Sequence, residues 1–123
     1  RSIWSRALNG QAIKTVHSIN DGEYGGETMI FWDQQQKKIA YYYFTTAGFY
    51  THGTMIYHPD TKSIEALEKV ENNAQGITQV RSHSVLDPTG MLQISSEYLQ
   101  NGKWVKGHSA TYKRVPQTEV KFH

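Results

Sequence analysis

The sequence predicts an all-β protein, an antiparallel up-and-down meander of eight to ten strands that closes into a barrel. Two observations predict this fold class. Turn sequences recur at fairly even spacing, among them Asn9-Gly10, Asp87–Gly90 and Asn101-Gly102, and they match the loops of β-hairpins. The runs between these turns are rich in Tyr, Thr, Val, Ile, Phe and Trp, which are the residues enriched in strands.

The turns divide the chain into nine candidate strands. These cover residues 3–8, 11–19, 25–32, 38–46, 49–58, 63–70, 76–86, 91–99 and 103–114. The composition of 63–70 would also suit a short helix. Nine sequential strands would leave exposed edges in an open sheet, and closure into a barrel removes these edges. A barrel of this size has room for one small ligand.

The length and composition exclude several classes of protein. A chain of 123 residues predicts a single domain, placed at 1–115, followed by a C-terminal tail at 116–123. The net charge is +2 and the Lys and Arg residues are scattered, so we expect no nucleic-acid partner. No run approaches the ~20 apolar residues that a membrane-spanning helix requires. Cysteine is absent, which excludes disulfides and thiolate chemistry.

The registers of the last two hairpins predict which residues of the C-terminal strands share a face of the sheet. The Asn101-Gly102 turn and the Asp87–Gly90 loop place Arg81, Glu97 and Lys106 in one row across three strands. Such a row of alternating charges is typical of a solvated face; the alternative is an inward Arg81 that anchors an anion. The opposite, interior face would carry Val80, Ser82, Ser84, Leu86, Leu92, Ile94, Ser96, Tyr98, Val105, Gly107, Ser109 and Thr111. These small, hydroxylated side chains leave space for water or a ligand.

Strands 25–32, 38–46 and 49–58 predict a second, aromatic wall. A two-residue Ala47-Gly48 turn would place on the interior face Thr28, Ile30, Trp32, Tyr41, Tyr43, Tyr50, His52, Thr54 and Ile56. The exterior face would carry Glu27, Met29, Phe31, Lys38, Tyr42, Phe44 and Met55. A bulge near Gly25-Gly26 would exchange the two faces. These aromatics could also serve only as core and partner surface.

Two histidines are candidates for a polar role inside the barrel. His17 lies on the same side of its strand as Ile13, Thr15 and Ile19. It would be a buried neutral histidine, a residue that contacts a ligand, or a general acid–base. His52 is predicted beside Tyr43, where it would orient a ligand or satisfy the tyrosine hydroxyl.

The sequence gives no support for a metal site or for a catalytic serine. No pair among the six histidines has the spacing of metal ligands on one element, and no Gly-x-Ser-x-Gly motif is present. Glu27 could act as a general base only if it faced inward. We therefore assign no catalytic residue, no metal and no cofactor.

Several segments resemble the calycin superfamily of lipocalins, fatty-acid-binding proteins, avidins and nitrobindin-like barrels. Arg6–Gly10, Asn20–Glu27, Tyr43–Tyr50, Ser96–Tyr98 and Gly102–Trp104 are similar to small bacterial lipocalin-like proteins of unknown function. The resemblance implies a ligand-binding barrel. Such relatives begin with a leader and a first strand that carries Gly-x-Trp, so we expect a processed or truncated N-terminus and a tenth strand.

The branches of the superfamily imply different ligands. Fatty-acid-binding members carry Arg-x-Tyr on the last strand, whereas this chain has Tyr112-Lys113-Arg114 on the predicted exterior face. Haem-binding members need an inward histidine, for which only His17 or His52 would serve.

The predicted function is the binding of a small amphipathic or hydrophobic molecule between the aromatic and hydroxyl walls. The predicted ligand-binding residues are Trp32, Tyr41, Tyr43, His52, Ser82, Ser96, Tyr98, Ser109 and His17. Two alternatives remain: a barrel enzyme of isomerase, cyclase or hydrolase type that uses His17 or His52 with Tyr43, and a protein that forms a homodimer through its outer aromatics. The compartment would be periplasmic or extracellular if a leader was removed, and cytoplasmic otherwise.

Overall fold

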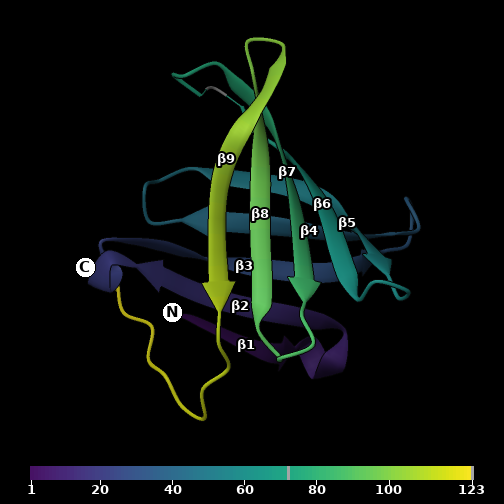
Figure 1. Cartoon of the computed structure of the whole chain (residues 1–123), viewed down its shortest axis with the longest axis vertical. Helices are drawn as coiled ribbons and strands as arrows, with labels where there is room; N and C mark the ends of the chain where they lie inside the picture. The colour runs from purple at the N-terminus through teal and green to yellow at the C-terminus, as the bar shows by residue number, and fades with distance from the viewer. Residues whose placement is uncertain (72, 123) are drawn as a thin grey trace. The chain divides into compact units, whose positions relative to one another are not determined.

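The computed structural model describes residues 1–71 and 73–122, and Asn72 and His123 lie outside the described residues. The chain forms antiparallel strands that follow one another in the sheet as they do in the sequence (Figure 1). They are β1 (Ser2–Ala7), β2 (Ala12–Ile19), β3 (Tyr24–Asp33), β4 (Lys38–Thr45), β5 (Tyr50–His58), β6 (Ser63–Lys69), β7 (Ile77–Leu86), β8 (Leu92–Gln100) and β9 (Lys103–Tyr112). The all-β meander is confirmed.

Each predicted strand is present, with ends within two residues of those expected. The ambiguous segment 63–70 forms strand β6, in which exposed and less exposed residues alternate. This period of two is that of a half-buried strand and not of a helix. Pairing with β7 along its full length therefore overrides a composition that would also suit a helix.

The chain divides into two compact units. Unit 1 comprises Arg1–His52 and Val115–His123, and unit 2 comprises Gly53–Arg114. Strands β1 to β4 belong to unit 1 and β6 to β9 belong to unit 2, while β5 contributes residues to each. The described tail residues 115–122 form no strand and belong to unit 1. The single-domain boundary and the closure into a barrel stay predictions.

The two C-terminal hairpin turns form as the sequence predicts. Asn101 and Gly102 have positive φ values of 51° and 81° and join the paired residues Gln100 and Lys103, as a type I′ turn requires. In the Asp87–Gly90 loop, Gly90 has a φ of 86°, and the Asp87 N–H donates to the carbonyl of Met91 at 2.9 Å. This loop is the predicted three-residue turn with a glycine bulge.

The carboxylate of Asp87 holds its own loop and the strand that follows. It accepts hydrogen bonds from the hydroxyl and amide of Thr89, from the amide of Met91 and from the side-chain amide of Gln93. These bonds, that of the Thr89 hydroxyl first, lower the pKa of Asp87 to about 2. Asp87 is therefore an anion at neutral pH and fixes the orientation of Gln93.

The loop between β1 and β2 is wider than the two residues, Asn9 and Gly10, that the predicted strands leave between them, and the loop between β2 and β3 has the same length. Ala7 pairs with Ala12 and Ile19 pairs with Tyr24, so four residues form each loop. Each includes a short 3-10 segment, η1 (Leu8–Gly10) or η2 (Asn20–Gly22). In both segments three successive residues have positive φ, so the left-handed conformation extends to the residue before Asn9-Gly10 and to the residue before Asp21-Gly22.

The loop between β4 and β5 differs from the predicted two-residue Ala47-Gly48 turn. The Thr45 N–H donates to the carbonyl of Phe49 at 3.1 Å, and Gly48 has a φ of 85°. This is the bonding pattern of the Asp87–Gly90 loop, with Gly48 as the bulge glycine. The register of β5 on β4 therefore moves by one residue, and every side chain of β5 changes face.

Ring contacts show the consequence of this shift. The ring of His52 lies 5.5 Å from that of Tyr42, and the ring of Tyr50 lies 6.0 Å from that of Phe44. The predicted pairing of His52 with Tyr43 is therefore wrong.

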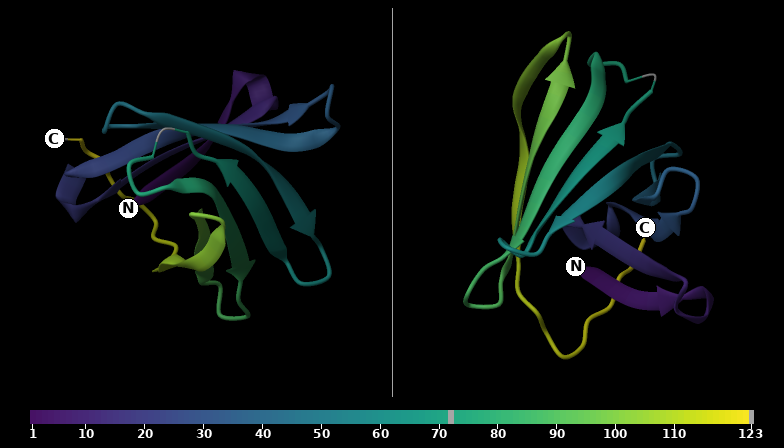
Figure 2. Two further views of the ribbon diagram at one scale, coloured as in Figure 1. Left: turned by 90° about the horizontal axis from the view of Figure 1, so that it is seen from above. Right: turned by 90° about the vertical axis from the view of Figure 1, so that its right-hand side faces the viewer.

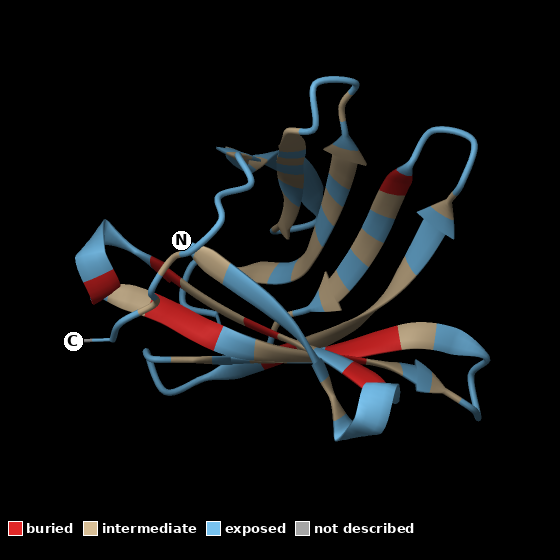
Figure 3. Cartoon of the chain, turned by 90° about the horizontal axis from the view of Figure 1, so that it is seen from below, coloured by how far each residue is buried: buried red, intermediate tan, exposed pale blue. Residues whose placement is uncertain are grey.

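The registers define two faces in unit 1. The His17 face carries Thr15, His17, Thr28, Ile30, Tyr41, Tyr43 and Thr51, and the Tyr42 face carries Lys14, Glu27, Met29, Phe31, Tyr42, Phe44, Tyr50 and His52. The His17 face holds the buried residues Thr15, Ile30, Tyr41 and Thr51, whereas most aromatics of the Tyr42 face are exposed. Figure 3 shows that buried residues concentrate on the strands of unit 1.

Unit 2 likewise has two faces. The Ser96 face carries Val80, Ser82, Ser84, Ile94, Ser96 and Tyr98, and the Ser95 face carries Arg81, His83, Gln93, Ser95, Glu97, Ser109 and Thr111. Every named residue of the Ser96 face is half-buried and every named residue of the Ser95 face is exposed. The predicted orientation of β7 and β8 is therefore confirmed.

Candidate functional site

The first candidate site surrounds Gly26 on the His17 face of unit 1. The registers of β3 with β2 and with β4 are continuous through Gly25 and Gly26, so these fully described strands have no bulge that would exchange the faces. A Cβ atom on Gly26 would overlap the carbonyl oxygen of Phe44 and lie 2.7 Å from Cε1 of Tyr43. Glycine therefore lets the ring of Tyr43 lie against the strand.

A chain of three polar side chains crosses this face. His17 Nε2 lies 2.6 Å from Tyr43 Oη, and Tyr43 Oη donates to Tyr24 Oη at 3.3 Å. Because Tyr43 has one hydroxyl proton, its bond to Tyr24 implies that His17 Nε2–H donates to Tyr43. The neutral ring then has Nδ1 as its unprotonated nitrogen. Burial lowers the pKa of His17 below 6.5, which keeps this ring neutral at physiological pH.

The side chains around this chain are uncharged, and the nearest positive charge is the N-terminal ammonium group of Arg1, which donates to the Ser18 carbonyl and also lowers the pKa of His17. Thr15, Ile30, Tyr41 and Thr51 on the same face are buried. The ring of His17 lies 5.3 Å from that of Tyr43 and 6.4 Å from that of Tyr24, the latter edge-on. Trp32 lies opposite Ile39 near the end of β3 and is 52% exposed. Of the predicted aromatic wall, Tyr41 and Tyr43 therefore lie near His17, and Trp32 lies at the margin.

The Tyr42 face places His52 away from the candidate site. Tyr42 stacks on Phe31, Phe44, Tyr50 and His52, with ring centroids 5.5–6.4 Å apart. The predicted role of His52 as the group that orients a ligand beside Tyr43 is therefore wrong. Its position follows from the bulged Thr45–Phe49 loop.

Glu27 lies on the same exposed face as this aromatic cluster. Its carboxylate lies 3.6 Å from the ammonium group of Lys14, and the Glu27 residue is exposed. It forms an exposed ion pair, which contributes little to stability, and it does not face the His17 site.

The predicted hydroxyl wall in unit 2 is present in part. Ser82 pairs with Ser96, Tyr98 pairs with Val80, and all four lie on the half-buried Ser96 face. A Cβ atom on Gly107 would lie 2.7 Å from Cε1 of Tyr98 and 2.9 Å from Oγ of Ser96. The ring of Tyr98 therefore lies against Gly107, as Tyr43 lies against Gly26.

Ser109 does not belong to this wall, because β9 has a bulge that the sequence analysis missed. Strands β8 and β9 lie side by side in unit 2 (Figure 2). Their register shifts between Ser95 and Glu97, so that Gly107 and His108 together oppose Ser96. The Ser96 hydroxyl accepts from the His108 N–H and donates to the His108 carbonyl, both at 2.9 Å. Ser109 then pairs with Ser95 on the exposed face. The predicted inward positions of Ser109 and Thr111 are wrong.

The charged row on the Ser95 face forms as predicted. Arg81 donates to both carboxylate oxygens of Glu97, at 3.2 and 3.1 Å, and Lys106 lies opposite Glu97. The guanidinium carbon of Arg81 also lies 4.0 Å from the centre of the Trp104 ring, as in a cation–π contact. Arg81 is exposed, so it is not the inward anion anchor that was the alternative.

Tyr24 is the member of the candidate site that the sequence analysis did not identify. It lies outside the predicted strand 25–32, whereas β3 begins at Tyr24 and pairs it with Ile19. A strand extended by one residue would have put Tyr24 on the same side as His17, since the two glycines that follow do not form a bulge.

Comparison of the chain with protein-family models, curated proteins and solved structures found no match. The calycin resemblance therefore stays a prediction. Among the described residues, no helix has the length and apolar character needed to cross a membrane. The described residues also include no cluster of three or more His, Cys, Asp or Glu side chains suited to a metal ion.

Proposed function

We propose that the His17 face of unit 1 binds a small amphipathic molecule. The observation that carries this proposal is the hydrogen-bonded chain of His17, Tyr43 and Tyr24 on a face that also holds the buried residues Thr15, Ile30, Tyr41 and Thr51. Ligand sites in proteins are commonly mostly apolar, with a few polar groups that orient the ligand. Here the buried Ile30 and Tyr41 would contact the apolar body, and the polar chain would bind the head group.

The chemistry of the chain favours a neutral head group. Burial first, and then the positive charge of the Arg1 amino group, lower the pKa of His17, so the neutral imidazole itself offers no full positive charge to a carboxylate. A hydroxyl or carbonyl group can instead exchange hydrogen bonds with the Tyr24 or Tyr43 hydroxyl. We therefore propose an alcohol, phenol or ketone as the ligand class.

Calorimetric titration with a pair of matched compounds tests this function. We expect para-propylphenol to bind about tenfold more tightly than propylbenzene, because only the phenol can join the hydrogen-bonded chain. The double variant Tyr24→Phe and Tyr43→Phe removes both tyrosine hydroxyls and should abolish that difference while propylbenzene binding is retained. Tyr57→Phe, at an exposed tyrosine of unit 2, is the matched control and should behave as the wild type.

Two results would refute the proposal: no binding of either compound, or an unchanged phenol preference in the double variant. Native mass spectrometry of the purified protein gives an independent reading, since it detects retained ligand and oligomeric state together.

A second candidate function is proton-transfer catalysis, which the 2.6 Å distance between His17 and Tyr43 favours. In the tautomer described above, Nδ1 of His17 is a neutral base at physiological pH. Tyr43 would stabilise the positive charge that His17 gains when it accepts a proton, because the Nε2–H donor becomes more strongly polarised. This arrangement suits an isomerase-type reaction better than a hydrolase, which would also need an activated nucleophile.

Elimination of nitrobenzisoxazole, in which a base removes a C–H proton and the N–O bond breaks, tests this function. We expect turnover to rise with pH through a midpoint below 6.5, because His17 acts as a base only when it is neutral and burial lowers its pKa. His17→Gln should lose this turnover, whereas His108→Gln, at an exposed histidine, should keep it. Equal rates in the two variants would exclude His17 as the base.

A further inference from the structure

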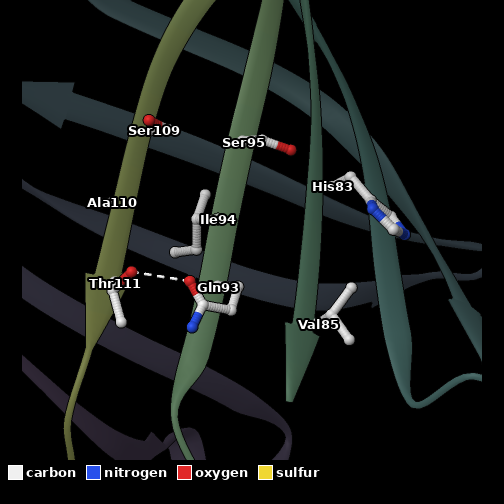
Figure 4. A pocket seen from close by; sticks show the side chains of 8 residues that line it. All are labelled: His83, Val85, Gln93, Ile94, Ser95, Ser109, Ala110 and Thr111. Atoms are coloured by element: carbon white, nitrogen blue, oxygen red, sulfur yellow. Dashed lines mark hydrogen bonds between the residues drawn. The ribbon is translucent and has the colours of Figure 1, made fainter. Parts of the chain in front are cut away.

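A hollow lies on the exposed Ser95 face of unit 2, on a different face from the predicted hydroxyl wall. Its volume is about 530 Å³, within the range of small-molecule sites in proteins. Strands β7, β8 and β9 contribute the lining residues His83, Val85, Gln93, Ile94, Ser95, Ser109, Ala110 and Thr111 (Figure 4). The register sets most of them in two rows: Ser95 lies between His83 and Ser109, and Gln93 lies between Val85 and Thr111.

The bulge in β9 determines which side chains line this hollow. Without the extra residue opposite Ser96, Ser109 would pair with Ile94 and point to the other face. The bulge instead places Ser109 opposite Ser95 and Thr111 opposite Gln93. Bulges often re-aim a side chain beside a functional site. Two of the hydroxyl groups in the hollow therefore depend on this irregularity.

Part of the hollow is held in a fixed arrangement. The Thr111 hydroxyl donates to Oε1 of Gln93 at 2.7 Å, and Nε2 of Gln93 donates to Oδ2 of Asp87 at 3.2 Å. Since its proton is engaged, the Thr111 oxygen is left as an acceptor toward a ligand.

The row of His83, Ser95 and Ser109 offers hydrogen-bonding groups that are not engaged within the described part of the protein. Among the described residues, none bonds to the hydroxyls of Ser95 and Ser109 or to the ring of His83. Each hydroxyl can donate and accept, and a neutral His83 ring can do the same through its two nitrogens. Together with Thr111, these groups span two adjacent rows of three strands.

The charges around the hollow favour an uncharged ligand. Of the described residues that line the hollow, none is Asp, Glu, Lys or Arg. Arg81 and Glu97 in the neighbouring row bind each other through two hydrogen bonds. Asp87 is engaged by Gln93 and by its own loop, while Glu65 lies opposite His83 on β6. A ligand with many hydroxyl groups and no net charge matches these donors and acceptors.

We propose that this hollow binds a neutral polyhydroxylated ring of the size of a monosaccharide. The hydroxyls of Ser95, Ser109 and Thr111 and the ring of His83 would bind the sugar hydroxyls, and Val85 would contact its apolar C–H groups. This site lies in a different unit from the proposed amphipathic site, so each proposal can fail without the other.

Heteronuclear NMR titration tests the proposal with the methyl glycosides of glucose, galactose, mannose and N-acetylglucosamine. We expect at least one of these to bind with about millimolar affinity and to shift amide signals of residues 93–95 and 109–111. The double variant Ser95→Ala and Ser109→Ala should weaken this binding about tenfold. Ser84→Ala, on the opposite face of β7, is the matched control and should bind as the wild type does.

A second variant separates the loss of a site from the loss of the fold. Ser109→Tyr should fill the hollow and abolish the sugar-induced shifts, while the amide signals of residues 79–82 keep their positions. The proposal is overturned if none of the four glycosides shifts the signals of 93–95 and 109–111. It is also overturned if the double variant binds as tightly as Ser84→Ala.

Discussion

The variant Gly26→Ala is expected to lower the free energy of unfolding by about 3 kcal/mol, at the upper end of the usual cost of overpacking. The added Cβ would overlap the carbonyl oxygen of Phe44, which belongs to the backbone of the neighbouring strand. That atom cannot move without disturbing the pairing of β3 with β4. The same Cβ would press on the ring of Tyr43 and displace its hydroxyl from His17.

Gly107→Ala is the comparison that makes this experiment specific. The atoms that its Cβ would meet belong to the side chains of Tyr98 and Ser96, which can shift by rotation. We therefore expect a smaller loss of about 1 kcal/mol. Urea titration followed by circular dichroism measures both values. If Gly26→Ala proves no more destabilising than Gly107→Ala, the ring of Tyr43 does not lie against Gly26 as described.

The second large effect is expected from a pair of neighbouring tyrosines in β4. Tyr41 is 7% exposed and Tyr42 is 41% exposed, because successive side chains in a strand point to opposite faces. Tyr41→Ala should lower the free energy of unfolding by about 3–5 kcal/mol, the usual cost of removing a buried aromatic ring. Tyr42→Ala should cost only about 1–2 kcal/mol, since it loses ring contacts on a face that is already exposed to solvent.

This pair of substitutions also tests the assignment of the faces in unit 1. A larger loss for Tyr42→Ala than for Tyr41→Ala would make the Tyr42 face the inner one. The inner side chains would then include Met29, Phe31 and Phe44, and the proposed site around His17 would be refuted. Urea titration of the two variants under identical conditions is sufficient to decide between the assignments.

The sequence predicted the strands well because their signals are local. Turn residues such as Asn101-Gly102 prescribe a backbone conformation through their own φ preferences, and the runs between turns have strand composition. The row of Arg81, Glu97 and Lys106 was predictable for the same reason, since two recognisable turns set the register of three strands.

The errors arose where one residue decides the register. Thr45-Thr46-Ala47-Gly48 has its glycine at the same position as Asp87-Pro88-Thr89-Gly90, but it lacks the Asp and Pro that mark the second loop. The bulge at Gly107 and His108 has no turn signal, because the two hydrogen bonds that hold it join the backbone of His108 to the Ser96 hydroxyl on another strand. Sequence patterns along one strand do not report such a contact. The placements of His52 and Ser109 were therefore wrong, while those of Ser82, Ser96 and Tyr98 were right.

The sequence predicted the residues of the candidate site better than the contacts between them. His17 and Tyr43 were both identified from the side of the strand on which they lie. Their direct contact depends on the close approach that Gly26 permits, which composition does not reveal.

The loop from Thr45 to Phe49 has a consequence for how such a protein can change over generations. Its length, and not the chemistry of β5, decides whether His52 and Tyr50 share a face with Tyr42 or with Tyr43. Loss or gain of a single codon in this loop would therefore exchange the two sets of β5 side chains in one step. No single substitution within β5 could alter the exposed aromatic surface as much. Loop-length variation is thus a single-step route by which this sheet could acquire a different exposed surface.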